Sequence, residues 1–450
     1  MKTTAVILAA GQGTRMRSAL PKVLHPLLGR PMVLYSLEAA QQATGTTPVM
    51  VIGHGAQGVK QVVGEAARYV IQEPQLGTAH ALMQAGPLLR HESDLVLVTT
   101  ADMALITTET YRKLIQAQSR HSGPITLLSV MADANSDFGR VLRGPDGGVQ
   151  AVVEVAQASE EQLAIHEVNT SVYCFSASWM WQALERIPLS PKGEYYLTDA
   201  VGLAVSEGLS VQALTVEDPE EAIGINTRIQ LAQAEAALRQ RINTGWMLAG
   251  VSLIDPATTY IEPGVRIGID TTIWPNTYLQ GQTVIGENCS IGPNAILRDT
   301  RVGERCEVLA SVLEKAVLED DVDVGPFGHL RKGAHLAHGV HMGNFGEVKD
   351  SYLGPGTKMG HFSYIGNATI GADVNIGAGT ITCNFDGEKK HPTEIGAGAF
   401  IGSDTMLVAP IKVGEGAHTG AGAVVTKDVP PDTLAVGMPA RAIRKLKKIA

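Results

Sequence analysis

The spacing of apolar residues divides this 450-residue chain into two parts with different hydrophobic periods. In residues 1–226, short apolar runs alternate with amphipathic stretches, which predicts a sheet covered by helices. The expected strands are Ala5–Leu8, Val49–Ile52, Leu95–Val98, Ile125–Val130 and Val172–Phe175. Residues 227–249 follow as a run of strong helix formers, so we expect a helical linker arm between the two parts.

In residues 250–450 an aliphatic residue recurs about every six positions, and a glycine often follows it. The series begins with Ile261, Ile267, Ile273, Leu279, Ile285, Ile291 and Leu297. Neither a helix nor an ordinary strand has this period, whereas a β-helix built of hexapeptides does, with three short strands in each coil. The number of repeats predicts about nine coils. The period is interrupted between Ile376 and Ile395, which predicts an insertion at Thr382–Glu394 that leaves the coil and carries function.

A glycine turn follows the first expected strand, in the segment Leu8-Ala-Ala-Gly-Gln-Gly-Thr-Arg-Met16. Such a turn between a strand and a helix usually binds a phosphate group. The dinucleotide pattern G-x-G-x-x-G fails because its third glycine is Met16, and the spacing of a P-loop is absent. The cations Arg15 and Lys22 lie on the same segment, so we expect it to bind an anionic substrate.

Composition limits the class of protein. Hydrophobic residues make up 44% of the chain and charged residues 18%, as in soluble globular proteins. The net charge of −9 argues against nucleic acid as a partner. We find neither a signal-peptide pattern nor an apolar run long enough for membrane insertion. Four scattered cysteines without C-x-x-C spacing indicate free thiols, so a cytoplasmic location is expected.

The quoted segments resemble two kinds of transferase. Leu8–Met16 and Pro21-Lys-Val-Leu-His25 are similar to sugar-1-phosphate nucleotidyltransferases, and the hexapeptide part is similar to acyltransferases. Together with Gly193-Glu-Tyr-Tyr-Leu-Thr-Asp199 and Asn375-Ile-Gly-Ala-Gly-Thr-Ile-Thr-Cys-Asn384, they resemble the bacterial GlmU family over essentially the whole chain. The resemblance implies a Rossmann-like α/β nucleotidyltransferase domain, a helical arm and a left-handed parallel β-helix.

The resemblance also implies two activities in the synthesis of UDP-N-acetylglucosamine, a precursor of peptidoglycan and lipopolysaccharide. The β-helix would acetylate glucosamine-1-phosphate with acetyl-CoA. The first domain would then join N-acetylglucosamine-1-phosphate to the uridylyl group of UTP with Mg²⁺ as cofactor, and release pyrophosphate. Members of this family are homotrimers with acetyl-transfer sites between adjacent β-helices.

For the nucleotidyltransferase domain, the resemblance implies contacts to UTP and the UDP-sugar and a magnesium site. The matched substrate contacts are Leu8, Ala9, Gly11, Arg15, Lys22, Gln72, Gly77, Thr78, Gly139, Glu154, Asn169 and Asn226. The matched magnesium ligands are Asp102 and Asn226, whose oxygen atoms suit this hard cation.

For the β-helix, His361 matches the family's catalytic base, and an imidazole is a side chain suited to accepting a proton from an amine. Glu347 is expected to orient it. The matched sugar-phosphate contacts are Arg331, Lys349, Tyr364, Asn375 and Lys390. The matched acetyl-CoA contacts are Asn384, Phe385, Ser403 and Ala421, with Arg441 as a candidate contact for a CoA phosphate.

Three alternatives compete with this interpretation. One is a sugar-1-phosphate nucleotidyltransferase whose β-helix serves only assembly or regulation, and another is a regulatory exchange-factor subunit of translation. The constellation of His361, Tyr364, Asn375 and Lys390 favours the bifunctional enzyme over both. The third alternative is a metal site on the β-helix, suggested by His335, His338 and His341, which are spaced three residues apart. In a coil of period six they fall at different places, which favours surface residues.

Overall fold

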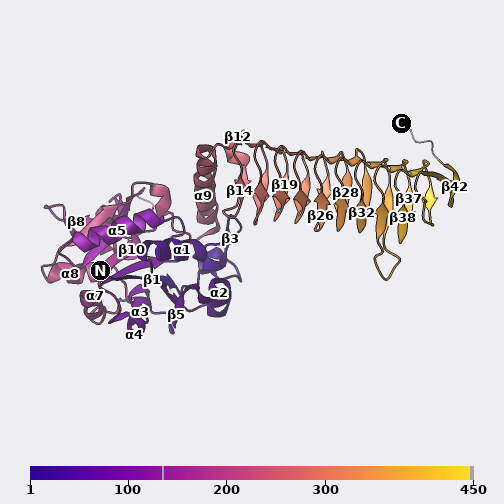
Figure 1. The fold of residues 1–450 in the computed structure, drawn as a ribbon. Coiled ribbons are helices and arrows are strands. Elements are labelled where there is room, and N and C mark those ends of the chain that lie inside the picture. The colour runs from indigo at the N-terminus through magenta and orange to yellow at the C-terminus, as the bar shows by residue number, and fades with distance from the viewer. Residues whose placement is uncertain (134–135, 446–450) are drawn as a thin grey trace. The chain divides into compact units, whose positions relative to one another are not determined.

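The computed structural model describes residues 1–133 and 136–445, which divide between Leu238 and Arg239 into two compact units. Figure 1 shows a sheet with helices in the first unit and a row of stacked coils in the second. Helix α9 (Arg228–Leu248) begins in the first unit and ends in the second. Among the described residues, no helix is both long enough and apolar enough to cross a membrane.

The first unit is built on one mixed sheet with the described strand order β11-β7-β10-β6-β1-β4-β5, to which the hairpin β8-β9 is joined through β10. In that order the bounds are Val211–Thr215, Ile125–Met131, Glu167–Ser176, Leu95–Thr100, Thr3–Ala9, Val49–Ile52 and Arg68–Ile71, with Arg140–Arg143 and Val149–Val153 for the hairpin. Strand β10 runs antiparallel to β6 and β7, while β1 is parallel to β4 and β6. All five strands expected in this part are therefore present, most of them longer than their apolar runs.

Helices connect these strands, and a small hairpin of β2 (Pro26–Leu27) and β3 (Arg30–Pro31) precedes α1. The helices of the first unit before α9 are α1 (Val33–Thr44), α2 (Ala56–Val63), α3 (Thr78–Met83), α4 (Gly86–Leu89), α5 (Thr108–Arg120), α6 (Glu160–Leu163), α7 (Ala177–Leu184) and α8 (Asp199–Ser206). Alternate buried residues of β1, β4 and β6 share one hydrophobic cluster with buried residues of α3, α7 and α8, so these helices pack on one face of the sheet.

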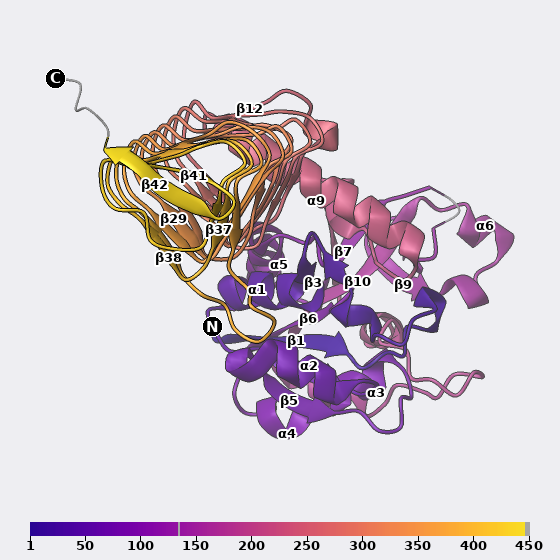
Figure 2. The same cartoon turned by 90° about the vertical axis from the view of Figure 1, so that its right-hand side faces the viewer.

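The second unit is a parallel β-helix, and Figure 2 looks along its superposed coils. In the described part of the chain its strands form three sheets, which we name sheets I, II and III. Sheet I contains β12 (Ser252–Leu253), β15 (Thr272–Ile273), β18 (Ser290–Ile291), β21 (Glu307–Val308), β24 (Asp323–Val324), β27 (His341–Met342), β30 (Lys358–Met359), β33 (Asn375–Ile376), β36 (Phe400–Ile401), β39 (His418–Thr419), β41 (Thr433–Gly437) and β42 (Ala440–Lys445).

Sheets II and III complete each coil. Sheet II contains β13 (Tyr260–Ile261), β16 (Tyr278–Gln280), β19 (Ile296–Arg298), β22 (Val312–Glu314), β25 (His329–Leu330), β28 (Gly346–Lys349), β31 (Ser363–Gly366), β34 (Ile381–Cys383), β37 (Met406–Val408) and β40 (Val424–Val425). Sheet III contains β14 (Arg266–Ile267), β17 (Val284–Ile285), β20 (Arg301–Val302), β23 (Val317–Leu318), β26 (Ala334–Leu336), β29 (Ser351–Leu353), β32 (Ala368–Ile370), β35 (Thr393–Ile395) and β38 (Ile411–Val413).

The interior of the β-helix is the predicted column of aliphatic residues, which is buried in one cluster. The described strands of sheet II number ten, one more than the coils predicted from the period. Leu313 fills the position between Val308 and Leu318 that the six-residue count misses, because the steps there are five residues long. Thr382 likewise points inward, where its hydroxyl accepts from the N–H of Gly366 at 2.8 Å.

The expected insertion at Thr382–Glu394 is therefore shorter than predicted. Its first residues belong to β34 and its last to β35, and residues 384–392 leave the coil as the loop visible in Figure 1. The aliphatic pattern hides this because a threonine, whose polar groups are satisfied inside the coil, takes the place of an aliphatic residue.

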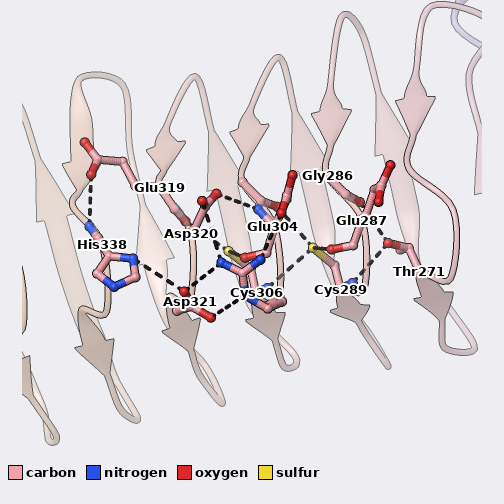
Figure 3. A network of polar contacts seen from close by, with 12 residues as sticks. Thr271, Gly286, Glu287, Cys289, Glu304, Cys306, Glu319, Asp320, Asp321 and His338 are labelled. Carbon is pink, nitrogen blue, oxygen red and sulfur yellow. Dashed lines mark hydrogen bonds and ion pairs between the residues drawn. The ribbon is translucent and has the colours of Figure 1, made fainter.

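One corner of the β-helix is held by a column of short polar side chains on consecutive coils (Figure 3). Thr271 Oγ1 accepts from the N–H of Cys289 at 3.0 Å. Cys289 Sγ donates to the carbonyl oxygen of Gly303 at 3.1 Å and accepts from the N–H of Cys306 at 3.4 Å. Both cysteines are buried, and all four cysteines of the chain are free thiols. The thiols of Cys289 and Cys306 thus hydrogen-bond to backbone groups of the adjacent coil, as the hydroxyl of Thr271 does.

Candidate active sites

A cavity of about 600 Å³ lies in the first unit, beyond the carboxyl ends of β1 and β6. Strand β1 delivers the turn that starts at Leu8, and β6 delivers Asp102 after its last residue. Nine of the predicted site residues line this cavity: Leu8, Ala9, Gly11, Lys22, Gln72, Gly77, Thr78, Asp102 and Glu154. Strand β1 lies between its parallel neighbours β4 and β6, and α/β sheets commonly bind ligands at the carboxyl ends of such central strands.

The glycine turn brings Lys22 close to the backbone of the loop. Gly13 has φ +63°, and a Cβ atom on it would lie 2.5 Å from Cβ of Lys22, so only glycine fits there without a shift. Lys22 opens the short 3-10 helix Lys22–Leu24, and its side chain is largely buried. The absence of a side chain at Gly13 therefore allows the Cβ atom of Lys22 to pack against the glycine turn.

The ammonium of Lys22 joins the two predicted magnesium ligands. Its Nζ lies 2.5 Å from Oδ2 of Asp102 and 2.9 Å from Oδ1 of Asn226. Burial alone would raise the pKa of Asp102, but the charge and hydrogen bond of Lys22 outweigh it and lower the pKa. Asp102 is therefore an ionised carboxylate. The N–H of Ile225 donates to the carbonyl oxygen of Asp102 at 3.1 Å, which ties the two segments together.

The residues present fit a hard divalent cation. Two oxygen atoms, one of them charged, converge on a single cationic group, and Mg²⁺ typically takes one or two protein ligands of this kind and completes its shell with water and phosphate. Among the described residues no group of three or more His, Cys, Asp or Glu side chains is arranged for a metal. Asp102 and Asn226 would therefore supply only part of the ligand shell of such a cation.

Gln72 and the Gly77-Thr78 turn form another wall of the cavity. Gln72 Nε2 donates to the carbonyl oxygen of Gly77 at 2.9 Å, and Thr78 Oγ1 accepts from the N–H of Leu197 at 3.0 Å. Gly77 has φ +96°, and a Cβ on it would lie 2.6 Å from the carbonyl oxygen of Tyr195. These bonds join the turn before α3 to the segment before α8, so the pocket wall is braced by residues distant in sequence.

Glu154, Gly139 and Asn169 lie on the other side of the first unit's site. Glu154 Oε1 accepts from the hydroxyl of Thr198 at 3.0 Å, and burial raises the pKa of Glu154 although this bond opposes the rise. The N–H of Asn169 donates to the carbonyl oxygen of Gly139 at 2.8 Å. Asn169 also donates its side-chain amide to the hydroxyl of Tyr173 at 2.7 Å, and Tyr173 lines the cavity. Gly139 and Asn169 therefore stand behind the lining.

Arg15 is placed differently from Lys22. Its guanidinium lies 3.4 Å from the carboxylate of Asp137, and both side chains are more than half exposed. The cavity also has walls to which the sequence assigned no role: Gln12, Gln75, Ser171, Tyr173, Glu194, Tyr196 and Thr198. Three of these residues, Glu194, Tyr196 and Thr198, lie in the segment Gly193–Asp199, and the family resemblance of this segment could have indicated that they belong to the site. Ser171 has φ +60° at an irregularity of β10, and nothing in the hydrophobic pattern marks it.

The second site lies along sheet II of the β-helix. His361 is exposed at the corner between β30 and β31. Glu347 stands in register with His329 on one side and Tyr364 on the other. Its Oε1 accepts from Arg331 at 2.9 Å. The structure therefore assigns Glu347 a bond to Arg331, whereas the sequence suggested that it orients His361.

Three predicted cations gather beside this row. The contact with Lys390 and the charge of its ammonium, with Arg331 adding to them, lower the pKa of Lys349. Tyr364 stands in register with Glu347, the residue that Arg331 contacts, so Tyr364 lies beside these cations. Like charges placed this close repel each other, and the arrangement is suited to an anion that neutralises them.

The loop of residues 384–392 is organised by its own bonds. Phe385 forms an antiparallel bridge with Lys390, and 60% of the Phe385 side chain is exposed. Asp386 accepts from the N–H of Lys389 at 2.7 Å and from His391 Nε2 at 2.6 Å, and these bonds hold its pKa well below the ordinary range. Asn384, buried at the loop's base, donates to Asn367 at 2.7 Å. The loop thus presents Lys390 from a fixed turn.

The other residues assigned to substrates lie on later coils. Asn375 stands in register with Lys358 and Phe400 on sheet I. Ser403 and Ala421 are exposed one coil apart, linked by a bond from the N–H of Gly422 to the carbonyl oxygen of Ser403 at 2.8 Å. Arg441 lies on β42 opposite Val436.

The three histidines spaced by three are separate surface residues, each beside its own carboxylate. His335 lies 2.8 Å from Glu319 and His338 lies 3.4 Å from Asp321 (Figure 3), while His341 contacts Asp323. Their place on three different parts of the coil explains why they do not converge on one point.

Comparison with known proteins agrees with both halves of this description. Residues 5–190 match the MobA-like NTP transferase domain, and residues 264–299 and 392–427 match the bacterial transferase hexapeptide repeats. The bifunctional protein GlmU of Heliobacterium modesticaldum is 47% identical over 97% of this chain and 95% of its own length. The GlmU of a Geobacillus species is 44% identical over 99% of this chain and 97% of its own length. The chain therefore belongs to the GlmU family, and it is a bifunctional enzyme, a nucleotidyltransferase joined to an N-acetyltransferase.

Proposed function

We propose that the β-helix transfers the acetyl group of acetyl-CoA to the amine of glucosamine-1-phosphate, and that the first unit transfers the uridylyl group of UTP to the N-acetylated product. The observation that carries this proposal is the presence of two polar sites, one in each unit, with different chemistry. One pairs an ionised carboxylate with a buried lysine, and the other pairs an exposed imidazole with a cluster of cations.

In the first unit the sugar-phosphate oxygen attacks the α-phosphorus of UTP, and pyrophosphate leaves. A magnesium ion held by Asp102 and Asn226 would neutralise the phosphates during this step. Lys22 supplies a positive charge at the same point, and the turn from Leu8 to Gly11 lets backbone N–H groups approach the phosphates. Gln72, Gly77 and Thr78 hold the nucleoside, while Gly139, Glu154 and Asn169 position the sugar. No protein nucleophile is needed, because this chemistry depends on positioning and charge.

In the β-helix the amine nitrogen attacks the thioester carbonyl carbon, a C–N bond forms and the C–S bond breaks. His361 accepts the proton that the nitrogen must lose and returns it to the leaving thiolate, giving CoA as a thiol. Its exposed position at a corner leaves the imidazole open to both substrates. Asn384, Phe385, Ser403 and Ala421 line the path of acetyl-CoA, and Arg441 binds one of its phosphates.

The phosphate of glucosamine-1-phosphate is bound by Arg331, Lys349 and Lys390, with Tyr364 and Asn375 holding the sugar. The lowered pKa of Lys349 supports this assignment, because a dianion bound between the cations would relieve their repulsion. The loop brings Lys390 beside Lys349, and the bond from the buried Asn384 to Asn367 anchors the base of this loop.

The working form of the chain is a homotrimer that associates through sheet II. The outward positions of this sheet carry Ile296, Val312, Ile381, Met406 and Val424, all partly exposed and in register. An apolar row of this length on a soluble protein usually marks an interface. The polar site at Glu347 and Tyr364 interrupts the row, which supports an acetyl-transfer site formed between subunits. The free thiols support a reducing cytoplasm as its location.

A pair of substitutions tests whether the two activities reside in separate sites. Asp102→Ala should lose most uridylyl transfer, measured as UTP-dependent release of pyrophosphate, and should leave acetyl transfer unchanged. His361→Ala should lower acetyl transfer, measured as release of CoA, by about 10²–10⁴-fold, the usual contribution of positioned proton transfer. It should leave uridylylation of supplied N-acetylglucosamine-1-phosphate at the wild-type rate.

Each variant is the control for the other, because both stay folded if their unaffected activity persists. Equal loss of both activities in a folded Asp102→Ala protein would contradict the assignment of the first unit. A folded His361→Ala protein with acetyl transfer within a few-fold of wild type would require a different base.

A further inference from the structure

The ammonium of Lys22 lies where a metal cation would have to bind. Its two partners, Asp102 Oδ2 at 2.5 Å and Asn226 Oδ1 at 2.9 Å, are the two oxygen atoms that fit a divalent cation. The side chains of Lys22 and Asp102 are only 13% and 17% exposed, so little water separates these groups. A carboxylate that already carries a buried ion pair at this distance is not free to ligate a second cation.

The local backbone fixes this arrangement. Gly13 allows the closest approach to the stem of Lys22, and Gln230 Oε1 accepts from the N–H groups of Asn226 and Thr227 at 2.9 and 3.0 Å. These contacts hold the backbone of the segments that carry Lys22 and Asn226, while the ammonium of Lys22 stands at the end of a flexible four-carbon side chain. Arg15, seven residues earlier, offers a contrast because it pairs with the exposed Asp137 instead.

We propose that Lys22 is a built-in counter-ion that occupies the cation position of the nucleotide-free enzyme and leaves it only when a nucleoside triphosphate arrives. This inference rests on the proposed function, in which Asp102 and Asn226 are the metal ligands. The phosphates of the nucleotide give the ammonium a new anionic partner, and the oxygen atoms that it releases become available to the metal. The metal and the nucleotide consequently enter together, and the metal alone binds weakly.

The test is the binding of Mn²⁺ alone, without nucleotide, followed by electron paramagnetic resonance of the free ion. Lys22→Met removes the ammonium and keeps a side chain of similar length. We expect this variant to bind Mn²⁺ at least about tenfold more tightly than wild type, because a competing positive charge beside the carboxylate has been removed. Arg15→Met is the matched control: it removes a charge from the same segment but not from Asp102, so its Mn²⁺ binding should equal that of wild type.

A second measurement covers the case that Lys22→Met folds poorly. In Lys22→Met the buried carboxylate of Asp102 has lost its partner, so the melting temperature of this variant should lie below that of wild type. Mn²⁺ should then raise the melting temperature of the variant by much more than it raises that of wild type. Lys22→Gln, which keeps a hydrogen-bond donor for Asp102, should show the same gain in Mn²⁺ affinity with a smaller loss of stability.

The outcomes separate this inference from the proposed function. If neither Lys22 variant binds Mn²⁺ more tightly than wild type, while Asp102→Ala still abolishes uridylyl transfer, the counter-ion role is wrong and the proposed metal ligands stand. If Lys22→Met gains affinity and the double variant Lys22→Met/Asp102→Ala keeps that gain, the cation binds elsewhere. Both the inference and the assignment of Asp102 are then overturned. Loss of the gain in the double variant supports both.

Discussion

The two glycines of the turn after β1 differ in what surrounds them. A Cβ on Gly13 would collide with Cβ of Lys22 at 2.5 Å, and φ at Gly13 is +63°. A Cβ on Gly11 meets no atom within 4 Å. One glycine is therefore required by the protein's own packing, while the other faces open space in the cavity wall.

Gly13→Ala should cost about 1–3 kcal/mol of stability, because a side chain is strained in the left-handed region and must also displace Lys22. Uridylyl transfer should fall with it. Gly11→Ala, the matched variant, should melt at the wild-type temperature and lose uridylyl transfer only because its methyl group keeps the phosphates from the backbone. Thermal unfolding and pyrophosphate release measure the two effects. Equal melting temperatures for both variants would contradict this division.

At the residue scale, the sequence could indicate chemistry but not every neighbour. Lys22, Asp102 and Asn226 were assigned to one site from family resemblance, and they do meet. Ser171 could not be found, because an irregularity within β10 turns it toward the cavity without any change in hydropathy. The bond of Glu347 to Arg331 depends on the stacking of β25 on β28, which the six-residue period gives only approximately.

At the scale of elements, the column of Thr271, Cys289 and Cys306 explains why thiols stand at a corner of the coils. Cys289→Ser keeps a donor for Gly303 and an acceptor for Cys306, and should leave stability nearly unchanged. Cys289→Ala leaves both of those backbone groups unpaired and should cost about 1–3 kcal/mol. The urea concentration at which circular dichroism and acetyl transfer are lost together measures the effect.

Cys383→Ala provides the control, because its thiol lies 3.9 Å from the carbonyl oxygen of Ile381 and holds no neighbouring coil. We expect its effect to stay within about 0.5 kcal/mol. If Cys289→Ala and Cys383→Ala unfold at the same urea concentration, the corner thiols contribute nothing beyond their volume.

The repeat of six predicted the β-helix well because each coil obeys the same local rule, one inward side chain per strand. The six-residue period failed at Leu313 and Thr382. The spacing or the residue type differs at these positions, yet both side chains still point into the coil. A step of five residues and an inward hydroxyl are both tolerated, the second because Gly366 satisfies that hydroxyl. Hydrophobic pattern alone cannot distinguish such positions from a loop.

At the scale of the whole molecule, the boundary between the units falls inside α9. The unit that starts at Arg239 includes the end of this helix. Asn243 donates to the carbonyl oxygens of Pro256 and Thr259 at 2.8 and 3.0 Å, and Ile242 and Trp246 pack on the interior of the β-helix. The last turns of α9 therefore close the first coil.

Two fragments test this boundary. Residues 239–450 should fold, form trimers and transfer acetyl groups without the first unit, because a solenoid depends on its neighbouring repeats. Residues 250–450 should be less stable by roughly 2–5 kcal/mol, since they lose two hydrogen bonds and the packing of Ile242 and Trp246. Light scattering, CoA release and thermal unfolding measure the three properties. A 239–450 fragment that is folded and trimeric but inactive would mean that acetyl transfer needs the first unit.

The end of the β-helix carries a feature with a consequence for how these molecules meet each other. Strand β42 runs antiparallel to β41, whereas the earlier strands of sheet I are paired in parallel. It also exposes Arg441, Arg444 and Lys445. A bare parallel edge is a template onto which another copy can add its first coil, and the process then repeats without limit. A reversed, positively charged strand offers neither the direction nor the charge for such addition, and so disfavours end-to-end stacking of copies at this edge of sheet I.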